Sequence, residues 1–168
     1  QQAFIPGQSY FGQNNYIEYI AGNLPIIIGV PHGGTLTPTN LPVIHNRGVD
    51  NGSFETSHLL YDSIVQHTNG CFPHMIISHL HPSVMNPVRE IDTAAGTNID
   101  ARNAWYEFHD FIDTAKFEIT NNWGAGHYFE MHGNGHSEMW TEVGLGVSKA
   151  YLNGSDSLIL SRTNYSTV

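Results

Sequence analysis

Two histidines stand where short apolar segments end, and each is followed by glycine. His32 follows the apolar run 25–30, and His132 follows the run 128–131. A glycine beside an imidazole lets a ligand approach the ring closely. Two histidines and one carboxylate are a common ligand set for catalytic zinc, with a fourth position left to water. The pair therefore indicates a metal site, the alternative being that each histidine is an ordinary turn residue.

The carboxylate that would complete such a site has three candidates. Asp50 lies in the loop before an expected helix, Glu55 lies in the first turn of that helix, and Glu130 lies two residues before His132. Glu55 has another explanation, because the helix dipole favours an acidic residue in the first turn. The residue pattern leaves the choice among the three open.

Two further residues are of types that suit substrate chemistry. Arg89 is one of six Lys and Arg residues, so it is a candidate clamp for a substrate carboxylate, against a surface ion pair with Glu90 or Asp92. Glu142 lies among apolar residues, a setting that raises the pKa of a carboxyl group and suits a general base. Catalytic and structural explanations of Glu142 stay equally open.

These residues need a scaffold that brings distant segments together, and the apolar pattern predicts an α/β fold. The predicted strands cover 25–30, 75–80, 128–131 and, as a fourth candidate, 142–147. The predicted helices cover 53–67 and 101–120, capped by Ser53 and Asp100. This alternation predicts a mixed, mostly parallel sheet flanked by helices, in which sites lie beyond the carboxyl ends of the strands.

Composition bounds the chain and argues against two classes of partner. Its 168 residues suffice for one core, so we expect a single domain over 1–168. That domain would comprise a lead-in at 1–24, a motif-bearing core at 25–148 and a C-terminal segment at 149–168. Six Lys and Arg against 15 Asp and Glu give a net charge of −9, which argues against a nucleic-acid binder. No apolar run approaches the length of a membrane span.

Three sequons and the histidine content suggest where the protein acts. Asn51, Asn153 and Asn164 each begin an N-glycosylation tripeptide, and the single Cys71 leaves no internal disulfide. We therefore expect a secreted glycoprotein. Protonation of all 11 His residues would bring the net charge from −9 to about +2, so pH-dependent self-association is a further expectation.

Four segments, taken in order, carry a resemblance to a known family. They are Pro25–Gly34, Asp50–Ser53, Asn86–Asp92 and Glu130–His136, followed by Thr141–Leu145. In their order and spacing, over most of the chain, they resemble the N-formylglutamate amidohydrolase family. The resemblance implies the zinc-exopeptidase (phosphorylase/hydrolase-like) fold, which that family shares with zinc carboxypeptidases and aspartoacylases.

The resemblance also implies a role for each matching residue. Arg89, helped by Asn86, would hold a substrate carboxylate, and Glu142 would be the general base for the attacking water. Zinc lowers the pKa of water and polarises a carbonyl, so the implied reaction is hydrolysis of an amide in a small acidic N-acyl amino acid or peptide end. The implied zinc ligands are His32, Asp50 and His132.

Some features depart from that family, and they leave the activity open. Pro82 stands where relatives often carry Arg, and Asn134 stands where His is usual. Relatives also continue well past the segment at 141–145, so we expect an incomplete or trimmed fold, with association to a missing C-terminal part. The alternative function is that of a catalytically degenerate relative, an extracellular structural, matrix or fibre-forming glycoprotein. His81 and His136 are further candidates for contacts around the metal or substrate.

Overall fold

The computed structural model describes residues 4–135, 153 and 155 of the chain. Contacts divide the chain into two units, Gln1–Gly133 with Val168, and Asn134–Thr167. The helices and strands given below all belong to the first unit. The expected strand at 142–147 lies outside the described residues, as does most of the second unit, so one domain over 1–168 stays a prediction.

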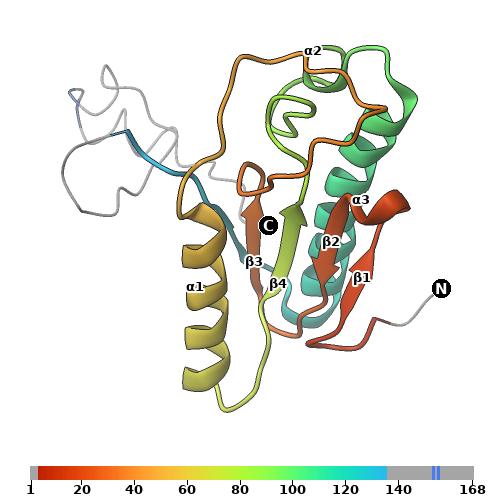
Figure 1. The fold of residues 1–168 in the computed structure, drawn as a ribbon. Coiled ribbons are helices and arrows are strands. Elements are labelled where there is room, and N and C mark those ends of the chain that lie inside the picture. The colour runs from red at the N-terminus through yellow and green to blue at the C-terminus, as the bar shows by residue number, and fades with distance from the viewer. Residues whose placement is uncertain (1–3, 136–152, 154, 156–168) are drawn as a thin grey trace. The chain divides into compact units, whose positions relative to one another are not determined.

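Five strands form one mixed sheet in the order β1-β2-β4-β3-β5 (Figure 1). The strands are β1 (Ser9–Phe11), β2 (Ile17–Ile20), β3 (Ile26–Val30), β4 (His74–Ser78) and β5 (His127–Glu130). β3 pairs in parallel with β4 and β5, whereas β2 runs antiparallel to β1 and β4. Among the described strands only β2 is reversed, which confirms the predicted mixed α/β sheet.

The central strands β3 and β4 are apolar on both faces. Ile27 and Ile76 belong to the hydrophobic cluster on one face, and Ile28 and Met75 belong to the cluster on the other. All four side chains are fully buried. Burial of both faces explains why the sequence shows continuous apolar runs here instead of alternation. Because these strands are buried, they fix the positions at which the loops after their carboxyl ends begin.

Two long helices cover the two faces of the sheet (Figure 1). α1 (Ser53–His67) packs Tyr61 against one face, and α3 (Ile99–Trp123) packs Phe108 and Ile119 against the other. Both predicted helices are confirmed. The first ends at the predicted residue and includes Ser53, its predicted cap, while the second extends beyond its predicted span at both ends.

The predicted helix caps are wrong, because the preceding residues take that position. Gly52, with a φ of 76°, is the N-cap of α1, and Ser53 begins the helix, its Oγ donating to the carbonyl of Asp50 at 2.7 Å. At α3, the side chain of Asn98 accepts from the N–H groups of Asp100 and the residue after it, at 3.0 and 3.1 Å. Asn98 thereby satisfies N–H groups that lack partners within the helix.

Long loops follow β3 and β4 and carry several of the candidate residues. The loop 31–52 leads from β3 to α1, and the segment after β4 contains the short helix α2 (Ile91–Ala95), which the sequence pattern does not predict. In the lead-in, β1 and β2 form a hairpin around a 3-10 turn, η1 (Gln13–Asn15). Within the described part of the chain, no helix has the length and apolar character to cross a membrane.

Candidate metal centre

His32 lies just beyond the carboxyl end of β3, where the apolar run before it predicts a site residue. The residue is 1% exposed. Its Nε2 donates to the Oδ1 of Asn86 at 2.7 Å, which leaves Nδ1 as the ring nitrogen that faces the other candidate ligands. A buried imidazole bonded in this way is held in one orientation and one tautomer.

Asp50 reaches His32 from the loop that precedes α1. Its N–H donates to the carbonyl of His32 at 3.0 Å, and its own carbonyl accepts from the N–H and Oγ of Ser53 at 3.1 and 2.7 Å. These bonds tie the backbone of Asp50 to the end of β3 and to the start of α1. The carboxylate is 11% exposed, and its Oδ2 lies 3.3 Å from the Nδ1 of His32.

His132 comes from the segment after β5, the strand that pairs with β3. Its Nδ1 lies 3.0 Å from the Oδ2 of Asp50, and its Nε2 donates to the Oε1 of Glu130 at 2.8 Å. The hydroxyl of Tyr128 donates to the other oxygen of Glu130 at 2.9 Å. The chain then passes close to Asp50, since a Cβ on Gly133 would lie 3.1 Å from the Cβ of Asp50.

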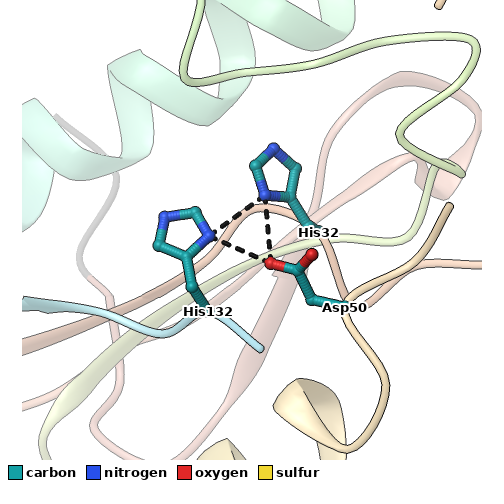
Figure 2. A group of neighbouring side chains, drawn as sticks. All are labelled: His32, Asp50 and His132. Carbon is teal, nitrogen blue, oxygen red and sulfur yellow. Dashed lines mark hydrogen bonds and ion pairs between the residues drawn. The ribbon is translucent and has the colours of Figure 1, made fainter. Parts of the chain in front are cut away.

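The three side chains point toward one another from three separate segments (Figure 2). The Nδ1 of His32, the Nδ1 of His132 and the Oδ2 of Asp50 form a nearly equilateral triangle with sides of 3.0, 3.1 and 3.3 Å. Zinc binds such atoms at about 2.0–2.2 Å, and a point about 2.1 Å from all three lies about 1 Å above their plane. The group therefore has the spacing of three corners of a tetrahedral zinc site and could hold a metal ion.

Burial and charge act differently on the three ionisable groups. Burial lowers the pKa of His32. The hydrogen bond to Glu130 raises the pKa of His132, with the bond to Asp50 adding to it against the effect of burial. Burial raises the pKa of Asp50, but the bonds from His132 and the N–H of Gly133 outweigh it and hold that pKa below its ordinary value. A neutral His32, an ionised Asp50 and a neutral His132 are the forms that bind a metal. The lowered pKa values of His32 and Asp50 therefore favour metal binding, and the raised pKa of His132 opposes it.

Arg47 belongs to this site, although the sequence pattern does not single it out. Its Nη2 lies 3.0 Å from the Oδ1 of Asp50 and 3.1 Å from the Nδ1 of His32. The guanidinium side chain is 38% exposed. The signal available in the sequence was its three-residue spacing from Asp50, in a chain with only six Lys and Arg residues.

The predicted substrate clamp lies on the loop after β4. Asn86 is 4% exposed, and its side-chain oxygen is occupied by His32. Arg89 is exposed, its N–H donates to the carbonyl of Asn86 at 3.1 Å, and its carbonyl accepts from the indole of Trp105 at 2.9 Å. The backbone of Arg89 is thus fixed beside a residue that contacts the metal cluster.

The other predicted site residues are separate from the cluster or lie outside the described part. The cluster contains Asp50 and not Glu55, which is exposed in the first turn of α1. His81 bonds the hydroxyl two residues further along the chain at 2.7 Å. Asn51 and Asn153 are exposed, as glycan attachment requires. Outside the described residues lie Glu142, His136 and Asn164.

Comparison with known proteins provides no further guide to this site. A scan against models of protein families, a search of curated proteins and a search of solved structures each found no match. The case for a metal centre therefore rests on the residue types and their geometry.

Proposed function

We propose that the protein binds one divalent metal ion, with zinc as the expected ion, and uses it to hydrolyse an amide. The observation that carries this proposal is the triangle of two imidazole nitrogens and one carboxylate oxygen with sides of 3.0–3.3 Å. Two histidines and one carboxylate leave a coordination position for water or substrate, as in catalytic zinc sites. A zinc ion at such a position supplies Lewis acidity and an activated water at neutral pH.

The chain's own residues support this role beyond the three ligands. Asn86 orients His32, and Glu130 orients His132, each through the ring nitrogen that does not face the cluster. Such partners fix the tautomer and direction of metal-binding histidines. Because both histidines are oriented in this way, we interpret the group as a cation-binding site and not as a chance cluster of polar side chains.

The substrate class follows from the resemblance to the N-formylglutamate amidohydrolase family. We assign to this protein the zinc-exopeptidase variant of the α/β fold and a small acidic N-acyl amino acid or peptide end as substrate. Arg89 would bind the substrate carboxylate, and Glu142 would take a proton from the attacking water and return it to the leaving amine. The exposed position of Arg89, next to Asn86 in the chain's fold, supports its part in this proposal.

Metal content tests the first half of the proposal. We expect one equivalent of zinc per wild-type chain by mass spectrometry, and much less in His132→Ala. His67→Ala is the matched control, because His67 is an exposed histidine of α1 outside the cluster. Full zinc loading of His132→Ala, or a wild-type protein that folds normally and takes up no zinc, would contradict the proposal.

Hydrolysis tests the second half. Zinc-loaded protein should release formate from N-formylglutamate, and Glu142→Gln should abolish turnover while leaving zinc content unchanged. Stoichiometric zinc without turnover would contradict the enzymatic proposal. It would favour the alternative of a non-catalytic extracellular protein that keeps the metal site.

A further inference from the structure

The guanidinium of Arg47 contacts two of the three candidate metal ligands. Its Nη2 lies 3.1 Å from the Nδ1 of His32 and 3.0 Å from the Oδ1 of Asp50. Both partners are well buried, whereas Arg47 enters from the loop with its side chain 38% exposed. A permanent positive charge thus stands at the edge of a cluster whose other residues are suited to bind a cation.

The contact with His32 involves the lone pair that a metal needs. A guanidinium has only donors, so the Nδ1 of His32 must accept, and its Nε2 carries the proton that goes to Asn86. The Nδ1 of His132, 3.1 Å away, approaches the same atom. One sp² lone pair binds one strong partner at a time, so a cation at Nδ1 and the bond from Arg47 exclude each other.

The contact with Asp50 does not involve the same oxygen. The Oδ2 of Asp50 lies 3.0 and 3.3 Å from the two histidine nitrogens, while Oδ1 receives Arg47. A metal ion at the triangle would use Oδ2 and leave Oδ1 to the guanidinium. Arg47 therefore has to give up His32 but can keep Asp50.

We propose that Arg47 sets the metal affinity of the site, by competing with the cation for His32 and by placing a positive charge beside Asp50. This inference rests on the proposed metal site. A competing cation weakens metal binding, so its removal should tighten it. A merely structural role for Arg47, as a support for Asp50, predicts the opposite sign.

Zinc affinity, measured by competition with a chromophoric chelator, distinguishes the two. We expect the Kd for zinc to fall at least about tenfold in Arg47→Gln, which loses the charge but keeps an amide donor for Asp50. Arg47→Lys, which keeps the charge, should stay closer to wild type. Lys116→Gln is the control, because it also removes one positive charge, from an exposed i,i+3 pair on α3.

The outcomes separate this inference from the proposed function. Wild-type protein that binds zinc, with Arg47→Gln binding it equally or more weakly, overturns the role of Arg47 and leaves the metal site standing. Equal tightening in Lys116→Gln also overturns it, because the effect would then come from net charge alone. Absence of zinc binding in wild type and in Arg47→Gln overturns both proposals.

Discussion

Glu130 supports His132 from behind, and replacing it with Gln tests how far that support governs the metal site. The Oε1 of Glu130 accepts from the Nε2 of His132 at 2.8 Å. Gln keeps the length of the side chain and an oxygen acceptor but removes the negative charge. A carboxylate behind a metal-binding histidine makes the ring a better ligand, and loss of such a partner costs 10–100-fold in metal affinity.

The exposure of the pair decides which end of that range to expect. The side chains of His132 and Glu130 are 37% and 33% exposed, so water screens part of their interaction. We therefore expect Glu130→Gln to raise the Kd for zinc about tenfold, equivalent to about 1.4 kcal/mol. The hydroxyl of Tyr128 holds the other oxygen of Glu130, so Tyr128→Phe should act in the same direction with a smaller effect.

The assay is a zinc titration against a chromophoric chelator at pH 7, with circular dichroism to confirm folding. Glu55→Gln is the matched control, since it makes the same change at an exposed carboxylate near the cluster in sequence. It should bind zinc as wild type does. Zinc binding by Glu130→Gln within about twofold of wild type would contradict this role of Glu130, as would an equal loss of affinity in Glu55→Gln.

Three further outcomes test the fold around the site. Burial lowers the pKa of His74 from 6.5 to about 4, so below pH 6.5 the unfolded chain binds a proton that the native protein does not. This difference should lower the free energy of unfolding by about 3 kcal/mol as the pH drops from 6.5 to 4. Urea unfolding across this range should show a shallower pH dependence in His74→Gln than in wild type, and the lowered pKa of His32 should leave a residual slope. Asn98→Ala removes the side-chain cap of α3 and should lower the free energy of unfolding by about 1 kcal/mol, whereas Asn103→Ala, within the helix, should cost less. Gly133→Ala should weaken zinc binding several-fold, because its Cβ would press on Asp50, while the unfolding midpoint should stay nearly unchanged. Unchanged zinc affinity in Gly133→Ala would contradict a close contact between residue 133 and Asp50.

Much of the scaffold could be predicted because its signals are local. The apolar runs that become β3 and β4, and the helical spacing that becomes α1, are properties of a few neighbouring residues. The exceptions are also local. Ser53 and Asp100 have the right residue types for caps, but the chain turns one or two residues earlier, at Gly52 and Asn98.

In the candidate site, too, only the residues with a local sequence signal could be predicted. The two strand-end histidines could be found from sequence, because a histidine and glycine after a buried strand form a recognisable pattern. The residue pattern leaves Asp50 and Glu55 open, and only the family resemblance names Asp50. The structure brings Asp50 to the cluster through the hydrogen bond between its N–H and the His32 carbonyl. Arg47 is not predicted from the sequence, because its contact with His32 arises only when the loop 31–52 returns to the end of β3.

By itself, the sequence determined the residue types, the strands that are followed by histidine, and the negative net charge with its small number of Lys and Arg residues. The tertiary structure alone decided which atoms meet. His32 and His132 are 100 residues apart, yet their Nδ1 atoms lie 3.1 Å from each other, because β3 and β5 pair in parallel and end at the same edge of the sheet. A metal site depends on distances of this kind, and spacing along the chain does not encode them.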